Sequence, residues 1–183
     1  MRFDDQPGLE GETIALRGML ESDRAMLAIA AKDPKTWAGH PVRDRHNAKV
    51  FNPYFDFLLC AGGTCVVTDK NSGNLIGCSR YYVGPDAPND IAIGFTFLNH
   101  LYWGGVTNFE MKTLMLDHAF ESFERVWFHI DPSSIRSQKA TEKLGAILLA
   151  KRKLDLIGAG KEAPWLSYEL VKDAWMRVKA AKQ

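Results

Sequence analysis

The sequence predicts one three-layer domain of the α/β (α+β) type, with a mixed, largely antiparallel central sheet of about seven strands and helices on both faces. Strand-like segments follow one another through short turns in the first half of the chain, and strand–helix–strand units come later. The chain has 183 residues, of which 46% are hydrophobic and 25% charged, so it can bury the core of one domain. It contains no repeat or long linker, and we expect residues 1–183 to form a single domain.

The first half of the chain predicts one strand, two helices and three more strands. Apolar and polar residues alternate in the first strand, and Ser22 is the expected N-cap of the first helix. The odd-numbered residues from Ile91 to Phe97 are expected to share one face of the last strand. The expected ranges are 13–17 for the first strand, 21–31 and 50–60 for the helices, and 64–69, 75–83 and 91–98 for the later strands.

The second half alternates helices with strands. A helix is expected after a glycine-rich turn, with Met111 and Met115 on its apolar stripe, and Gly145 is expected to end the next helix. The final helix is basic and amphipathic. The expected ranges are 126–130, 146–156 and 164–170 for the strands, and 133–144 and 173–182 for the last two helices.

Charge and composition exclude several classes of protein. Lys and Arg total 23 and Asp and Glu total 22, a balance that argues against a dedicated nucleic-acid binder. Apolar runs are far shorter than the roughly 20 residues of a membrane span, and the first twelve residues lack the apolar region of a signal peptide. Cys60, Cys65 and Cys78 have no metal-ligand spacing. We therefore expect free thiols in the cytoplasm, no metal and no membrane partner.

A glycine-rich turn between a strand and a helix is the most informative segment, reading WGGVTNFEMK over residues 103–112. Thr107 and Glu110 have capping-box spacing. Such a turn collects backbone N–H groups at the positive end of a helix dipole, which suits an anion, although any tight turn favours glycine. The segment is neither a Walker loop nor a dinucleotide-binding fingerprint.

A second segment, SSIRSQKATEKLGA over residues 133–146, also opens a helix after a strand. Ser137, Thr141 and Leu144 fall at helical spacing, which predicts that Ser137 lies on the inward stripe. Arg136 and Lys139 flank this stripe. They could meet a phosphate at its edge or be solvated surface charges.

Together these segments resemble the GNAT superfamily of acyl-coenzyme A-dependent N-acyltransferases, in the branch that contains the ribosomal-protein N-terminal acetyltransferases. The resemblance covers nearly the whole chain in element order and implies acetyl-coenzyme A as co-substrate. The residues that carry it are Ile93-Gly94-Phe95, Tyr102-Trp103-Gly104, Glu110, Ser137 and Lys143-Leu144-Gly145-Ala146.

The resemblance also implies where the coenzyme binds. The pantetheine arm would follow the main chain at the end of strand 91–98, in a cleft where this strand and strand 126–130 splay apart. The pyrophosphate would lie on the amides after Trp103, and two serines and a lysine would line the other wall. The implied coenzyme-binding residues are Phe97, Leu98, Trp103, Gly104, Gly105, Val106, Thr107, Asn108, Ser134, Ser137 and Lys139.

Acetyl transfer from a thioester to an amine requires a deprotonated amine, donors for the carbonyl oxygen and a proton for the leaving thiolate. Family position assigns the acid role to Ser137, because the tyrosine of other branches is replaced by Thr141. The usual glutamate is replaced by Ala92, so Asp90, His40, His46, a water-relayed base and the absence of any base stay open. A turn-capping aspartate and surface histidines are equally consistent with these residues.

We expect residues 37–47 to shape the acceptor pocket, with Trp37, His40 and Arg43 as substrate-binding candidates, although Trp37 also fits a packing role. The predicted function is direct transfer of acetyl from acetyl-coenzyme A to a primary amine, either a protein amino terminus or a small molecule. The alternative is a non-catalytic acyl-coenzyme A-binding module. No nucleic-acid partner is expected, and both a monomer and a homodimer stay open.

Overall fold

The computed structural model describes residues 3–182 of the chain, which divides into two compact units. Among the described residues, the first unit comprises residues 3–81 and 95–115, and the second comprises residues 82–94 and 116–182. Strands β4 (Leu75–Tyr82) and β5 (Ile91–Leu98) and helix α3 (Thr107–Phe120) each have residues in both units. The chain therefore passes between the units inside regular elements rather than through a linker.

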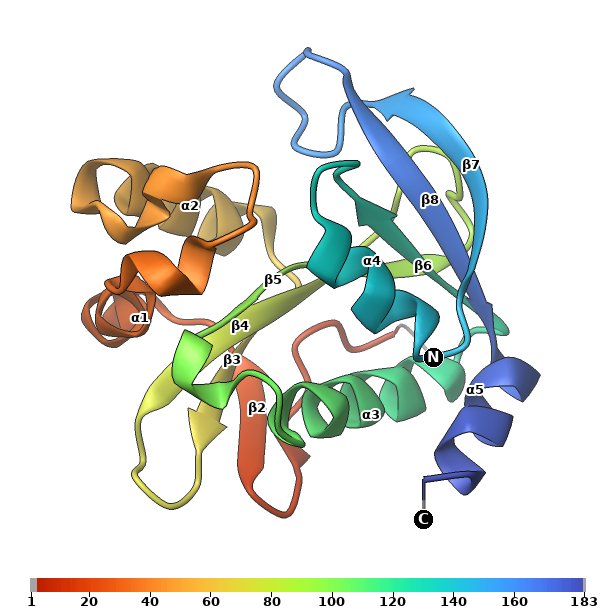
Figure 1. The fold of residues 1–183 in the computed structure, drawn as a ribbon, viewed down its shortest axis with the longest axis horizontal. Helices are drawn as coiled ribbons and strands as arrows, with labels where there is room; N and C mark the ends of the chain where they lie inside the picture. The colour runs from red at the N-terminus through yellow and green to blue at the C-terminus, as the bar shows by residue number, and fades with distance from the viewer. Residues whose placement is uncertain (1–2, 183) are drawn as a thin grey trace. The chain divides into compact units, whose positions relative to one another are not determined.

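The strands form a mixed, largely antiparallel sheet, as predicted (Figure 1). Within residues 3–182 it has eight strands in the order β1-β2-β3-β4-β5-β6-β8-β7. Strands β5 and β6 run parallel, as expected for two strands joined by the crossover helix α3. The eighth strand, which the sequence did not predict, is the two-residue β1 (Leu9–Glu10). The remaining strands are β2 (Ile14–Gly18), β3 (Thr64–Asp69), β6 (Arg125–Ile130), β7 (Ile147–Leu154) and β8 (Ala163–Val171).

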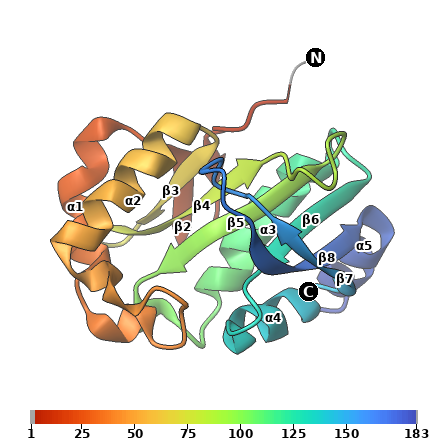
Figure 2. The same ribbon diagram turned by 90° about the horizontal axis from the view of Figure 1, so that it is seen from above.

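In the first unit, β2, β3 and β4 form an antiparallel meander. The predicted hairpin between β3 and β4 is confirmed, and its turn closes through a Gly73 N–H bond to the Asp69 carbonyl at 2.8 Å. Helices α1 (Arg24–Ala31) and α2 (Ala48–Ala61) lie side by side in both views (Figures 1 and 2).

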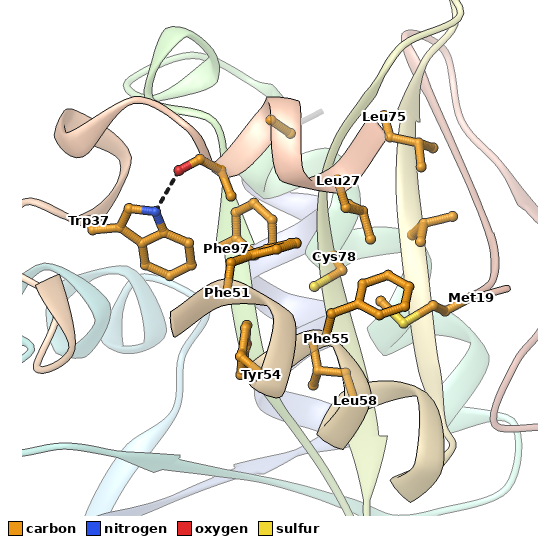
Figure 3. Close-up of a cluster of buried hydrophobic side chains, with 13 residues drawn as sticks. Met19, Leu27, Trp37, Phe51, Tyr54, Phe55, Leu58, Leu75, Cys78 and Phe97 are labelled. Carbon is orange, nitrogen blue, oxygen red and sulfur yellow. Dashed lines mark hydrogen bonds between the residues drawn. The ribbon is translucent and has the colours of Figure 1, made fainter. Parts of the chain in front are cut away.

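Helices α1 and α2 bury an aromatic-rich core against the strands of the first unit (Figure 3). Leu27 and Phe55 are completely buried at its centre. Trp37 is 1% exposed, and its indole N–H donates to the Ala31 carbonyl at 2.8 Å. Its polar atom is therefore satisfied inside the core, as a buried indole requires.

Strand β4 shows that helices cover both faces of the first unit's strands, since successive side chains of a strand point to opposite faces. Cys78 belongs to the core cluster formed with α1 and α2. The next residue, Ser79, accepts a hydrogen bond from Lys112 of α3, and the Tyr81 hydroxyl donates to the Met115 carbonyl of α3. Cys78 thus faces α1 and α2, whereas Ser79 and Tyr81 face α3.

The second unit contains β6, β8 and β7 together with helices α4 (Ile135–Glu142) and α5 (Lys172–Ala180). Asp117, near the end of α3, accepts from the Trp175 indole at 2.8 Å and from Lys179 at 2.5 Å. Trp175 is fully buried. These contacts fix α5 against the C-terminal end of α3.

Two local predictions are wrong in detail. The first helix begins as a 3₁₀ turn over Glu21–Asp23, and it is the Asp23 carboxylate, not Ser22, that accepts the Leu20 N–H at 2.8 Å. Helix α4 begins at Ile135 rather than at Ser133, because Ser134 has ψ 63°, outside the helical region, and it ends at Glu142 rather than at Leu144. The three cysteines are free, as predicted, and burial raises the pKa of Cys65 and Cys78 to about 12.

Candidate active site

The glycine turn before α3 belongs to the first unit and is open to solvent. Gly104 has φ 73°, a left-handed conformation that favours glycine. A side chain added at Gly104 or Gly105 would meet no protein atom within 4 Å. The Trp103 indole N–H fixes one end of the turn by donating to the Leu98 carbonyl at 2.9 Å. The turn thus leaves space for a ligand directly ahead of a helix N-terminus.

Glu110 anchors the first turn of α3. Its carboxylate accepts hydrogen bonds from the Thr13 N–H at 2.8 Å and from the Thr13 hydroxyl. A Cβ at Gly11 would lie 2.3 Å from the same carboxylate, so glycine gives Glu110 room to reach Thr13. The reciprocal bond from Thr107 to Glu110 that a capping box requires stays a prediction. The observed role of Glu110 is to hold the start of α3, and with it the glycine turn, beside Thr13 at the start of β2.

Strand β5 is irregular where the sequence predicts coenzyme contacts. Phe95 has φ 51°, in the left-handed region that is uncommon for a bulky side chain. Its carbonyl accepts from the Tyr54 hydroxyl at 3.0 Å. Regular alternation does not continue through such a residue, so the predicted common face from Ile91 to Phe97 is wrong. Phe97 and Leu98, just beyond the irregularity, are buried at 6% and 5% exposure.

The serine candidates lie around α4 in the second unit. Ser134 precedes the helix and is buried, whereas Ser137 and Lys139 are exposed. Thr141 and Leu144 are buried, so the prediction that they face inward is confirmed. The same prediction is wrong for Ser137, which is exposed. The Ser137 hydroxyl is therefore on the surface of its unit.

The two candidate bases in the predicted site are both held by neighbouring groups. Asp90, in the second unit, accepts from the Trp127 indole at 3.0 Å and pairs with Arg125 at 3.3 Å. His40, in the first unit, has Nε2 at 3.2 Å from an Arg45 guanidinium nitrogen and Nδ1 at 3.2 Å from the Val42 carbonyl oxygen. Because arginine only donates, His40 Nε2 acts as the acceptor in this pair. The lone pair of His40 Nε2, which a general base would use, already accepts this hydrogen bond from Arg45.

The expected acceptor region has a buried and an exposed part. Trp37 is a core residue that contacts the His40 ring edge-to-face at 5.3 Å. Arg43 is exposed, and Arg45 stacks over the Tyr54 ring at 3.7 Å. The arginine–aromatic contact positions the His40 ring above the core.

Two buried polar networks were missed by sequence reasoning. In the first unit, the Lys112 ammonium group lies 3.0 Å from the Thr96 hydroxyl and 3.3 Å from that of Ser79, and burial lowers its pKa to about 7. In the second unit, the Tyr82 hydroxyl lies 2.7 Å from His129. Lys112 occupies an ordinary helical position and His129 an ordinary strand position. No local pattern marks either residue as part of a polar cluster.

Within residues 3–182, no group of three or more His, Cys, Asp or Glu side chains is arranged to hold a metal ion. The same residues contain no helix that is both long and apolar enough to cross a membrane.

The family model and the fold identify the class of this protein as an acetyltransferase. Residues 13–147 match the acetyltransferase (GNAT) domain, and the chain belongs to this family. It is a GNAT acetyltransferase, and the activity that the family implies is acetyl transfer from acetyl-coenzyme A to an amine nitrogen. The glycine turn fits the coenzyme, because open space surrounds Gly104 and Gly105 at the start of α3.

Solved structures share the fold. A GCN5-related N-acetyltransferase from Brucella melitensis matches with a TM-score of 0.78 at 16% identity, over 98% of this chain and 85% of that one. A T. thermophilus protein assigned as an acetyltransferase gives 0.71 at 26% identity, over 95% and 94%. Mycobacterium smegmatis RimJ in complex with CoA-disulfide gives 0.65 at 18%, over 92% and 89%. No curated protein matches the sequence.

Proposed function

We propose that this chain moves the acetyl group of acetyl-coenzyme A to a primary amine by direct attack within a ternary complex. The observation that carries the proposal is the exposed glycine turn at the start of α3, where neither Gly104 nor Gly105 has a protein atom near its Cβ position. In a chain of the GNAT family, such a turn supplies backbone N–H groups and space for a pyrophosphate.

In this proposal, backbone groups make more of the contacts with the coenzyme than charged side chains do. The amides from Gly104 to Asn108 hold the pyrophosphate, and the pantetheine arm follows the end of β5 at Phe97 and Leu98. The left-handed Phe95 supports this assignment, because strained backbone in an otherwise regular strand is frequent at ligand sites. Further contacts come from Trp103, Ser134, Ser137 and Lys139.

The leaving thiolate receives its proton or a hydrogen bond from Ser137. The exposed position of this hydroxyl on α4 supports the role, since a serine packed in the core could not reach a ligand. A main-chain N–H near Phe97 stabilises the charge that develops on the thioester oxygen. No covalent enzyme intermediate is needed, and holding both substrates at near-attack distance supplies much of the rate enhancement.

The acceptor is a primary amine, either a protein amino terminus or a small molecule. His40 and Arg43 border its pocket, and Trp37 supports the His40 ring from below. Asp90 and His40 stand as bases only if their present partners release them, because both already hold hydrogen bonds or ion pairs within the protein.

The coenzyme site is tested by calorimetry with acetyl-coenzyme A. Gly104→Val should lower the affinity at least about tenfold, because its side chain fills the space of the ligand. Gly73→Val is the matched control, since Gly73 has φ 72° and the same open surroundings in the β3–β4 hairpin. Equal affinities of both variants and the wild type would contradict the assignment.

Catalysis is tested by a thiol-release screen with acetyl-coenzyme A against small amines and short peptides. We expect thiol release with at least one amine, and Ser137→Ala should then lower kcat by roughly 10²-fold while leaving coenzyme affinity nearly unchanged. Coenzyme binding without release against the whole panel would instead identify a non-catalytic binding module.

A further inference from the structure

Three side chains of the second unit form a continuous buried network, here called the Tyr82–His129–Asp86 network. The Tyr82 hydroxyl at the end of β4 lies 2.7 Å from Nδ1 of His129 on β6. Nε2 of His129 lies 2.9 Å from Oδ1 of Asp86, in the loop after β4. The other Asp86 oxygen accepts from the Ser167 hydroxyl at 3.0 Å and lies 3.7 Å from an Arg152 nitrogen. Both carboxylate oxygens are thus engaged.

The chemistry of the partners fixes the direction of these hydrogen bonds. An ionised carboxylate only accepts, so His129 Nε2 carries a hydrogen and donates it to Asp86. In a neutral imidazole, Nδ1 then bears the lone pair and accepts from the Tyr82 hydroxyl. Hydroxyl, imidazole and carboxylate therefore follow one another in the order of a Ser–His–Asp triad. A phenol oxygen that donates its hydrogen in this way still has lone pairs with which to accept one.

Two glycines allow the backbone to approach this network. A Cβ at Gly84 would lie 2.6 Å from Cε1 of His129. A Cβ at Gly94 would lie 3.0 Å from Cε1 of Tyr82 and 3.2 Å from its hydroxyl oxygen. The Tyr82 ring thus lies against β5 at Gly94. Any side chain at either glycine would move one of the two rings.

The network lies where the pairing of β5 with β6 ends. The paired residues of these parallel strands are Ile91 with Val126 and Ala92 with Trp127. Gly94 and His129 each come two residues later, and Gly94 is followed directly by Phe95. The proposed pantetheine contacts begin just beyond this residue. Gly94, against which the Tyr82 hydroxyl lies, is thus three residues before Phe97, the first of the proposed pantetheine contacts on β5.

Burial and the neighbouring Asp86 charge act in opposite directions on the pKa of His129. Both residues are buried, with 6% of His129 and 7% of Tyr82 exposed. Burial lowers the pKa of His129, Asp86 raises it in part, and Arg152 lowers it further. The groups that face His129 are Tyr82 of β4, Asp86, Ser167 of β8 and Arg152 of β7. At neutral pH the imidazole is therefore uncharged.

We propose that the Tyr82–His129–Asp86 network is the proton relay that deprotonates the acceptor amine, an inference that rests on the proposed function. Tyr82 takes a proton from the substrate ammonium while its own hydroxyl proton passes to His129 Nδ1. The amine becomes neutral, and the imidazolium is paired with Asp86. Tyr82 is the catalytic residue, and His129 and Asp86 are positioning residues that act through it.

The proton balance of the transfer is complete. The neutral amine attacks the thioester carbonyl carbon, the carbon–sulfur bond breaks, and the second amine proton reaches the leaving thiolate through the Ser137 hydroxyl. His129 returns its proton to solvent through Tyr82, which restores the neutral network. One acetyl group moves, one thiol forms, and one proton is released in each turnover.

The catalytic role of Tyr82 is tested by Tyr82→Phe against Tyr81→Phe. The control loses the same atom and one buried hydrogen bond, from the Tyr81 hydroxyl to the Met115 carbonyl at 2.7 Å. Tyr82→Phe should lower kcat by roughly 10²-fold with unchanged acetyl-coenzyme A affinity, and Tyr81→Phe should leave kcat within about threefold. Equal effects of the two variants on kcat would overturn the proposal.

The pH profile tests whether His129 acts through Asp86. In the wild type, kcat/KM should rise with pH as His129 loses its proton. Because Asp86 raises the pKa of His129, Asp86→Asn should move this acidic limb to lower pH. An acidic limb that stays in place in Asp86→Asn would show that another group controls it and would overturn the relay.

A third measurement does not depend on turnover. Nitrogen-15 NMR of the imidazoles at pH 7, assigned with His129→Gln, should show a neutral His129 that carries its hydrogen on Nε2. An imidazolium, or a hydrogen on Nδ1, would overturn the relay even if the enzyme is active. Absence of thiol release from the wild type with every amine would instead contradict the proposed function.

Discussion

The two buried polar networks differ in the charge of the group that faces the basic nitrogen. Lys112, in the first unit, contacts the hydroxyls of Ser79 and Thr96, which carry no charge. His129, in the second unit, contacts the Asp86 carboxylate. Burial lowers the pKa of both bases, but at His129 a carboxylate opposes it. A protonated His129 is thus paired at once, whereas the Ser79 and Thr96 hydroxyls offer Lys112 dipoles rather than a charge.

Lys112 and His129 therefore have different roles, although neither carries a full charge near pH 7. The hydrogen bonds of Lys112 connect α3 to β4 and β5. Protonation of the buried Lys112 amine lowers the free energy of unfolding. The histidine network can take up a proton with its counter-charge already in place. A buried base thus becomes suited to proton transfer through its carboxylate partner rather than through burial alone.

The largest effect should come from removing that carboxylate. Asp86→Leu leaves the His129 N–H and the Ser167 hydroxyl buried without their acceptor, and should lower the free energy of unfolding by about 3 kcal/mol. Asp86→Asn keeps one carbonyl acceptor and should cost about 1 kcal/mol. Urea unfolding at pH 7 measures both. Glu162→Leu, an exposed change before β8, serves as the control, and an equal loss in it would contradict the role of Asp86.

The Lys112 network should show itself in the pH dependence of stability. Folded Lys112 loses its proton near pH 7, whereas the unfolded lysine keeps its proton to about pH 10.5. Between these values the unfolded chain binds more protons, so the free energy of unfolding rises with pH, by roughly 2 kcal/mol from pH 7 to 9. Lys112→Met should lose this rise.

The control for that series is Lys151→Met, at an exposed position of β7, which should keep the full rise. Urea midpoints at pH 7, 8 and 9 decide the matter. If the urea midpoint changed with pH in the same way for the wild type and Lys112→Met, Lys112 would be protonated in the folded chain throughout this range.

The smallest effect should come from crowding the histidine network without removing a partner. Gly84→Ala places a Cβ 2.6 Å from His129 Cε1, so the ring must shift, at a cost of about 1 kcal/mol. The control Gly8→Ala meets no atom within 4 Å and should change stability by less than about 0.5 kcal/mol. Thermal unfolding measures the stability of both variants. Equal stabilities would mean that the loop carrying Gly84 can shift without a cost in free energy.

Much of the secondary structure followed from the sequence, because it depends on neighbours along the chain. The strands over 64–69 and 91–98 have the predicted ends, since apolar residues at strand spacing are bounded there by turn-forming residues. The glycine turn before α3 was predicted from the residues alone, because only glycine adopts φ 73° without strain.

The position of Ser137 and the irregularity of β5 were not predictable in the same way. Helical spacing predicts which residues lie on one side of a helix, but it does not say how much of that side other elements bury. Ser137 lies on a part that remains exposed. Phe95 reads as an ordinary strand residue, and its left-handed backbone became visible only in the folded strand.

The sequence by itself determined the family, the order of the elements and the turn that can hold an anion, because local periodicity and glycine placement carry that information. The tertiary structure alone decided which polar groups meet. Tyr82 and His129 are 47 positions apart, and their contact depends on strand register and on Gly94 leaving room for a ring. Hydrogen-bond partners and burial set the proton affinity of a side chain, and both arise only when distant segments pack together.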